Sequence, residues 1–219
     1  MTKFIIVTPS SNQSKFLKSC VKSVKDQIND SFIVHHHVQD AHSTDDTLNF
    51  LEKYYQENKD IKNYIFSYEV KKDNGMYDAL NYSFEMLLNS NDDCICSWLN
   101  CDEQYLKDTL NVVYKNFSKN KKIDILLGNY LVVDNFGKLI SYRKITSPRI
   151  AYIQTQHLSN LSCANFYKSD IFSKVKFDIS LKAVADEKFF IDILKLKPKV
   201  KVVKKYLSVF SFTHKNLGM

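Results

Sequence analysis

Short apolar runs alternate with amphipathic stretches in the first half of this 219-residue chain. Four of the runs, "KFIIVT", "SFIVHHHVQD", "NYIFSYEV" and "CICSWLN", have the length and composition of buried strands. The stretches between them have helical spacing and predict helices that start at Ser14 and after His42, and helices over residues 76–89 and about 104–117. Strands that alternate with helices predict an α/β fold with a mostly parallel central sheet and helices on both of its faces.

The second half of the chain has a different pattern. The segments "DILLGNYLVVD" and "KLISYRK" flank Asn135-Phe136-Gly137 and predict a β-hairpin. A loop-rich stretch from Ser147 to Asn160, a short strand near 162–167, a helix over about 185–196 and a basic strand are expected to follow. Because neither a repeat nor a low-complexity linker interrupts the sequence, residues 1–219 are expected to form one domain.

Composition narrows the possible partners. The chain has four glycines, which are too few and too scattered for a P-loop or for a G-x-G-x-x-G dinucleotide site. It has 31 basic and 24 acidic residues, and the net charge of +7 favours polyanionic ligands such as nucleotide phosphates. The lysines are not interleaved with an aromatic platform, so we do not expect nucleic-acid binding.

The densest basic run extends from Lys195 to Lys205, with six lysines in eleven positions. One interpretation is a polybasic patch that contacts an anionic membrane surface. The other is an edge strand whose lysines face water and prevent edge-to-edge aggregation. The two interpretations are compatible, and the edge strand is the simpler one.

Cysteine and histidine positions favour packing over metal binding. The five cysteines form no C-x-x-C pair, and Cys94 and Cys96 share one face of a predicted buried strand. Reduced core thiols are therefore favoured over a zinc site with Cys101, and they indicate a cytoplasmic protein. The run His35 to His37 lies on a predicted strand, where successive side chains point to opposite faces, so we expect these histidines to flank the core. No apolar run approaches membrane-spanning length.

Acidic and amide residues follow three of the predicted strands. Asp40 ends the second strand, Asp73 and Gly75 follow the third, and Asn100 and Asp102 follow the fourth. Ligands of such sheets bind at the carboxyl ends of the strands, so these residues are expected at one rim. Carboxylates gathered there repel one another unless a cation shares the site. Asp102 is therefore the candidate ligand of a divalent metal that bridges a diphosphate.

Four segments resemble, in order and spacing, a family-two glycosyltransferase of the GT-A fold, an inverting family that uses nucleotide-sugar donors. They are "IIVTPSSNQSKFLKSCVKSVKDQ", "HVQDAHSTDDTLNFLEKY", "DNGMYDALNYSFEML" and "WLNCDE". The third and fourth resemble the D-x-G-x-Y-D-A-x-N and W-L-N-x-D-D stretches of one subgroup. The resemblance covers roughly residues 4–106 and implies a nucleotide-sugar-binding half over 1–106 and an acceptor-binding half over 107–219.

The resemblance also implies roles for the first and last of these segments. Asp40 would accept a hydrogen bond from the nucleotide base, most naturally the uracil N–H, and Pro9 and Asn12 would shape the loop beside the nucleotide. Asp102 would bind Mn²⁺ or Mg²⁺, and Asn100 would help to orient the same site.

The third segment would line the sugar-phosphate side of the donor, through Asp73, Gly75, Asp78 and Asn81. Asp78 and Asn81 are three residues apart on one predicted helix, so both side chains are expected to point at one ligand.

Four positions depart from the family pattern. Ser11 stands where the family often has Tyr, and His42 and Asp46 replace two common glycines. Asp46 is acceptable at a helix start, where its spacing from Ser43 predicts a capping box. Glu103 replaces the second Asp of the metal motif, which keeps the charge on a longer side chain.

An inverting transfer needs a base that takes the proton of the acceptor hydroxyl. The segment "LKAVADEKFFIDIL" offers Asp186, Glu187 and Asp192 at the start of the late helix. Helical geometry places Asp192 on the far side from the apolar stripe and does not separate the other two. The resemblance favours Asp186, with Glu187 as the alternative. His214 is a further candidate for the metal or a phosphate, with an exposed tail histidine as the alternative.

We therefore expect transfer of one sugar from a UDP-sugar to a glycan or lipid-linked acceptor. The resemblance implies a setting in bacterial surface polysaccharide or lipopolysaccharide synthesis, in the cytoplasm and peripheral to the inner face of the membrane. The alternative is a degenerate domain that binds a nucleotide-sugar without turnover, which the Asn100 position leaves open.

Overall fold

A nine-stranded mixed sheet forms the centre of the protein in this computed structural model, which describes residues 1–89, 93–156 and 160–213. The strand order is β3-β2-β1-β4-β8-β6-β9-β5, and β7 pairs with β6. The strands are β1 (Thr2–Ser10), β2 (Phe32–Asp40), β3 (Tyr64–Val70), β4 (Cys94–Trp98), β5 (Glu103–Tyr105), β6 (Ile125–Asp134), β7 (Leu139–Arg143), β8 (Asn165–Lys168) and β9 (Val200–Phe212).

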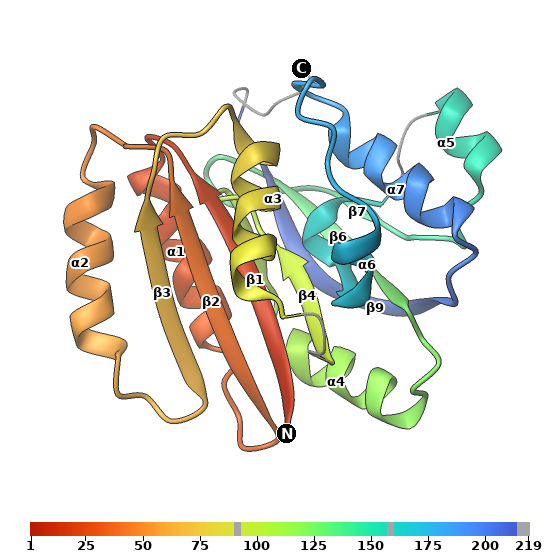
Figure 1. Cartoon of the computed structure of the whole chain (residues 1–219), viewed down its shortest axis with the longest axis horizontal. Coiled ribbons are helices and arrows are strands. Elements are labelled where there is room, and N and C mark those ends of the chain that lie inside the picture. The colour runs from red at the N-terminus through yellow and green to blue at the C-terminus, as the bar shows by residue number, and fades with distance from the viewer. Residues whose placement is uncertain (90–92, 157–159, 214–219) are drawn as a thin grey trace.

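Helices cover both faces of the sheet, as the sequence predicts (Figure 1). They are α1 (Ser14–Lys25), α2 (Thr47–Asn58), α3 (Met76–Leu87), α4 (Thr109–Lys119), α5 (Ile150–Gln156), α6 (Asp170–Lys174) and α7 (Ala185–Lys195). The chain winds from β1 to β2 and β3 in one direction and then returns to β4 on the other side of β1. Because such crossovers are right-handed, α1 and α3 lie on opposite faces.

The parallel part of the sheet consists of β3, β2, β1 and β4. Beyond β4 the sheet is mixed, because β8 is antiparallel to both β4 and β6, while β6 is parallel to β9. The predicted hairpin is confirmed as β6 and β7, joined by a turn in which Gly137 has a φ of 84°. The fold is thus α/β as expected, but its second half is less parallel than the sequence pattern indicated.

Two predicted segments differ in the structure. The helix expected over 104–117 begins at Thr109, because residues 103–105 pair with β9 as the short strand β5. The stretch expected to be loop-rich contains the helix α5. Local periodicity could not reveal β5, because this strand depends on a partner strand about a hundred residues later in the chain.

Aromatic and histidine side chains pack as the sequence predicts. Trp98 is buried and stacks on Tyr167 with a centroid distance of 5.7 Å. His36 is fully buried and shares a hydrogen bond of 2.9 Å with Thr8, whereas His35 bonds Ser67 on the neighbouring strand. Burial lowers the pKa of His36 to about 3, so this imidazole is neutral at physiological pH. All five cysteines are buried thiols.

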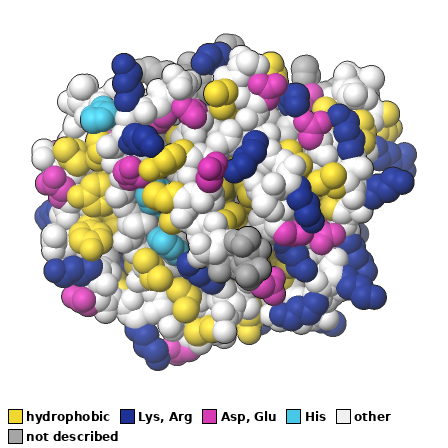
Figure 2. Space-filling view, viewed as in Figure 1, with side chains coloured by type: hydrophobic (Ala, Val, Ile, Leu, Met, Phe, Trp, Pro, Cys, Tyr) yellow, Lys and Arg dark blue, Asp and Glu magenta, His cyan; other side chains and the backbone are white. Residues whose placement is uncertain are grey.

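The basic run lies on the last turn of α7 and the first half of β9. Among the described strands, β9 pairs only with β6 over residues 200–203, so this part is an edge, and Lys201, Lys204 and Lys205 are exposed. The edge-strand interpretation is thereby confirmed. Figure 2 shows Lys and Arg side chains gathered on the right of the view, over the C-terminal half of the molecule. Within the ranges that the structure covers, no helix is long and apolar enough to cross a bilayer.

Gly128 in β6 allows β9 to approach closely. The β6–β9 register shifts next to this residue, and the Leu207 side chain lies over it. A Cβ added at Gly128 would come within 2.5 Å of Leu207 Cγ. Leu207 is 1% exposed, so it has little room to move.

We predict that Gly128→Ala destabilises the fold by about 1–3 kcal/mol through overpacking. Urea unfolding of the single variants and of Gly128→Ala/Leu207→Ala measures this cost. The alanine at 128 should cost clearly less when Leu207 is also alanine, because the clash is then removed. Equal costs of the alanine at position 128 in both backgrounds would contradict the close approach of Leu207 to Gly128.

Candidate active site

A cavity of about 400 Å³ opens where the chain changes winding direction, at the carboxyl ends of β1 and β4. This is the position at which α/β sheets bind ligands, because the loops that lead to helices on opposite faces diverge there. Six of the residues predicted for the site line the cavity: Pro9, Asp73, Gly75, Asn100, Asp102 and Asp186. Residues about 180 positions apart in the sequence are thus brought to one rim.

Asn12 and Asp40 lie outside the cavity lining and hold two loops together. Asn12 Oδ1 accepts hydrogen bonds from the Thr44 backbone N–H (2.7 Å) and hydroxyl, and the Asn12 N–H donates to Ser43 Oγ at 2.7 Å. Asp40 is fully buried, and its carboxylate accepts from the Ser43 hydroxyl at 2.6 Å and from the Ser43 N–H at 2.8 Å. In this structure the Asp40 carboxylate orders the loop after β2, and its contact with a nucleotide base stays a prediction.

The predicted capping box is wrong, because Ser43 bonds Asp40 and Asn12 instead of a helix terminus. Helix α2 begins at Thr47, whose N–H and hydroxyl both donate to the Asp45 carboxylate. The preceding loop contains His42 with a φ of 58°. This left-handed conformation is the one that glycine adopts without strain, and His is among the residues that tolerate it.

The loop before α3 bends around Gly75, which has a φ of 121°. The Gly75 N–H donates to Asp73 Oδ1 at 2.9 Å, and burial raises the pKa of the Asp73 carboxyl. Asp78 accepts from the Asn74 N–H and side-chain amide, outside the cavity lining. Asp73 and Gly75 thus lie at the site, whereas Asp78 stabilises the turn that presents them.

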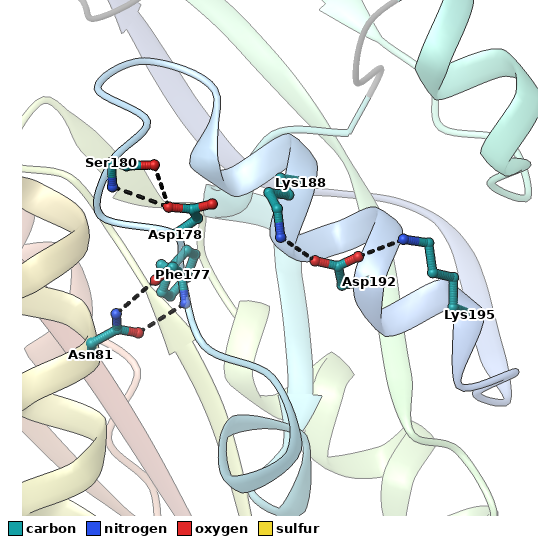
Figure 3. Close-up of polar contacts among 7 residues, drawn as sticks. All are labelled: Asn81, Phe177, Asp178, Ser180, Lys188, Asp192 and Lys195. Atoms are coloured by element: carbon teal, nitrogen blue, oxygen red, sulfur yellow. Dashed lines mark hydrogen bonds and ion pairs between the residues drawn. The ribbon is translucent and has the colours of Figure 1, made fainter.

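Asn81 contacts the second half of the chain instead of the cavity (Figure 3). Its amide donates to the Phe177 carbonyl and accepts from the Phe177 N–H, both at 2.9 Å. The expectation that Asp78 and Asn81 point at one ligand is therefore wrong. The helical spacing was correct, but each side chain binds protein backbone.

After β4, Asn100, Asp102 and Glu103 all line the cavity. Glu103 is 1% exposed and its Oε2 accepts from the Asn100 N–H at 2.8 Å. Burial, and next the charge of Asp102, raise the pKa of Glu103 well above its usual range. One oxygen of the Glu103 carboxylate therefore holds the turn that presents Asn100 and Asp102.

A divalent cation fits this rim in part. Asn100 Oδ1 is buried without a hydrogen-bond partner in the described part of the chain, and it lies two residues from the Asp102 carboxylate at the cavity. Hard cations prefer such oxygen ligands. The described residues contain no cluster of three or more His, Cys, Asp or Glu side chains that could hold a metal. Asp102 and Asn100 could therefore hold Mn²⁺ or Mg²⁺ only if substrate phosphate or water completed the coordination.

The first turn of α7 brings Asp186 into the cavity. Its Oδ1 accepts from the Tyr77 hydroxyl at 3.1 Å and from the Glu187 N–H at 2.9 Å. Burial raises the pKa of the Asp186 carboxyl. Glu187 does not line the cavity, and Asp192 pairs with Lys188 and Lys195 at 2.7 Å each on the outer side of the helix (Figure 3).

The cavity lining thus favours Asp186 over Glu187, the two candidates for the base that helical spacing did not separate. His214 lies outside the described residues. The sequence analysis missed Tyr77, Ser162 and Phe210, which also line the cavity. Ser162 and Phe210 come from a 3₁₀ turn and from β9, far from the motif segments, and give no local signal. Tyr77 lies within the third motif segment, so its signal was present.

We predict that Ser43→Ala destabilises the protein by about 1–3 kcal/mol, because it removes a hydrogen-bond donor from the fully buried Asp40 carboxylate. Ser180→Ala is the matched control. Ser180 donates its hydroxyl to Asp178 at the same distance of 2.6 Å (Figure 3), but that pair is exposed, and little change is expected. Urea unfolding of both variants measures the difference, and equal effects would contradict the role given to Asp40 burial.

No curated protein matches the sequence. Among solved structures, S. aureus TarS 1–349 in complex with UDP-GlcNAc superimposes with a TM-score of 0.73 at 22% identity, over 96% of this chain and 59% of that one. The mannosyltransferase PcManGT from Pyrobaculum calidifontis, in complex with GDP-Man and Mn²⁺, gives a TM-score of 0.68 at 11% identity, over 94% of this chain and 56% of that one.

This chain therefore spans less than two thirds of either structure, and the likeness shows the fold, which is GT-A. The family model "Glycosyl transferase family 2" matches residues 5–176. That range includes β1 to β4 and the acidic rim at their carboxyl ends. The chain belongs to glycosyl transferase family 2.

Proposed function

We propose that this glycosyltransferase moves a single sugar from a nucleotide-sugar to a hydroxyl group of a glycan or lipid-linked acceptor, with inversion at the anomeric carbon. The observation that carries the proposal is the cavity at the switch point between β1 and β4. It holds Asp102 at the end of β4 and Asp186 at the start of α7, which are a candidate diphosphate-side group and a candidate base. Two groups with different tasks at one rim are what such a transfer needs.

A UDP-sugar is the donor that we propose. TarS, the most similar of the two compared structures by TM-score, was solved with UDP-GlcNAc and also with UDP. PcManGT was solved with GDP-Man, so nucleotide diphosphate sugars as a class are common to both. The net charge of +7 also favours a diphosphate ligand.

Asp186 acts as the base in this proposal. Its carboxylate takes the proton of the acceptor hydroxyl while that oxygen attacks the anomeric carbon, and the bond between this carbon and the diphosphate oxygen breaks. Attack from the side opposite the leaving group inverts the configuration. The burial that raises the pKa of Asp186 brings the group closer to the operating pH, where a base is most effective.

Asp102 and Asn100 would hold a divalent cation together with the donor diphosphate. When bound there, Mn²⁺ or Mg²⁺ would neutralise charge that develops on the departing nucleotide. Asp73 and Gly75, on the loop before α3, also line the cavity and would contact the sugar. Pro9 and Ser11, at the end of β1, would contact the nucleotide.

The setting that we propose is bacterial surface polysaccharide synthesis at the inner face of the cytoplasmic membrane. The exposed lysines of β9 support contact with anionic lipid, since each basic residue near such a surface adds about 1 kcal/mol of attraction. The second candidate is a domain that binds a nucleotide-sugar without turnover. Glu103 favours this candidate, because its buried carboxyl is bonded to the Asn100 N–H and has a raised pKa, and the neutral form is a poor metal ligand.

Thermal-shift titration with UDP, GDP, CDP and dTDP, each with and without Mn²⁺, tests the donor site. We predict stabilisation by UDP that requires Mn²⁺ and is lost in Asp102→Ala. A ligand that binds only the folded state adds about 2.7 kcal/mol at a hundredfold excess over its Kd. Stabilisation by GDP alone would indicate a GDP-sugar as the donor in place of a UDP-sugar. No shift with any nucleotide would contradict the proposed function. UDP release from UDP-GlcNAc then separates an enzyme from a pure binder.

A further inference from the structure

Helix α3 and the loop before it contact the stretch from Phe177 to Asp186 at three points. Asn81 binds the backbone of Phe177, the Asn74 carbonyl accepts from Lys182 Nζ at 3.2 Å, and the Tyr77 hydroxyl donates to Asp186. Tyr77 and Asn81 are four residues apart and therefore lie on the same face of α3. The first turns of α3 thus hold the whole stretch from residue 177 to residue 186.

The Phe177 ring joins the two helices. It stacks on Tyr77 of α3, with a centroid distance of 5.6 Å and an interplanar angle of 24°. Its other stacking partner is Phe189 of α7, at 4.0 Å and 19°. Phe189 lies one turn after Asp186 on α7, and both Phe177 and Phe189 are almost fully buried. The pair of bonds from Asn81 fixes the Phe177 backbone, so the ring has little freedom to move (Figure 3).

Tyr77 is suited to hold a carboxylate. The residue is 5% exposed, and burial, followed by the charge of Asp186, raises the pKa of the phenol, which therefore keeps its proton to donate. A hydrogen bond to the ionised form of a carboxyl favours that form. The Tyr77 bond thus opposes the effect of burial on Asp186.

We propose that Tyr77 is a positioning residue for Asp186, held in place by Asn81 through Phe177. This inference rests on the proposed function, in which Asp186 is the base. It assigns the Tyr and Asn of "DNGMYDALN" to the support of the base instead of to the donor sugar. Without the hydroxyl of Tyr77, the carboxylate loses both a fixed orientation and a donor that keeps it ionised.

Other titratable groups also face Asp186. Among the described residues they are Glu187 on the same helix, Glu103 in β5 and Tyr167 in β8. Glu187 and Glu103 carry acidic side chains, which disfavour the ionised form of Asp186 when they are charged. Tyr77 is the group whose side chain donates a hydrogen bond to the Asp186 carboxylate.

The test compares Tyr77→Phe with Tyr82→Phe. Tyr82 lies on the same helix and donates its hydroxyl to the Glu69 carboxylate at 3.1 Å, outside the cavity lining, so it is a matched control. Carboxyl ¹³C NMR over about pH 5 to 9 gives the pKa of Asp186 in each protein, with Asp186→Asn used for assignment. The rate of UDP release from UDP-GlcNAc is measured over the same range.

We expect Tyr77→Phe to raise the pKa of Asp186 and to shift the acid limb of kcat/KM to higher pH. The loss in kcat/KM should be on the order of tenfold near pH 6 and smaller at alkaline pH, because a donor to a charged group is removed. Tyr82→Phe should leave both the pKa and the profile unchanged. Asn81→Ala keeps the hydroxyl but frees Phe177, and we expect a smaller change in the same direction.

An unchanged Asp186 pKa in Tyr77→Phe would overturn the inference, as would an equal loss of activity at every pH or an equal effect in Tyr82→Phe. If neither the wild-type protein nor any variant releases UDP, the proposed function fails. The NMR titration still decides whether Tyr77 controls the state of Asp186, because it does not depend on turnover.

Discussion

The handedness of the crossovers in the parallel sheet determines where this protein can bind a ligand. β1, β2 and β3 are added in one direction and β4 in the other, so the connections after β1 and β3 lead to α1 and α3 on opposite faces. The space between them is the cavity that holds Asp73 and Asp102. The positions of the remaining site residues depend on this divergence.

The second half of the chain completes the cavity by returning to the same rim. β8 and β6 extend the sheet beyond β4, and the buried rings of Trp98, Phe177 and Phe189 pack α7 against it. This packing brings the first turn of α7, with Asp186, to the same cavity as the residues that follow β4. The aromatic core thus fixes the position of the Asp186 carboxylate at the cavity.

The sequence predicted the four parallel strands and their helices, because these elements have strong local periodicity. It predicted six cavity residues correctly, since the carboxyl ends of parallel strands share a rim by geometry. Asp40, Asp78 and Asn81 were expected at a ligand, and in the structure their side chains bind Ser43, Asn74 and Phe177. Residue type and spacing are the same for a ligand contact and for a loop contact, and only the tertiary structure distinguishes them. The strand β5 and the role of Tyr77 depend on partners about a hundred residues away, so local patterns could not reveal them.

The central claim is that Asp186, and not its neighbour Glu187, takes the proton of the acceptor hydroxyl. UDP release from a UDP-sugar, measured for Asp186→Asn and Glu187→Gln at equal fold stability, tests it most directly. The account predicts a loss of roughly 100-fold or more for Asp186→Asn, with UDP binding retained, and a change of less than about threefold for Glu187→Gln. Full activity in Asp186→Asn, or the larger loss in Glu187→Gln, would contradict it.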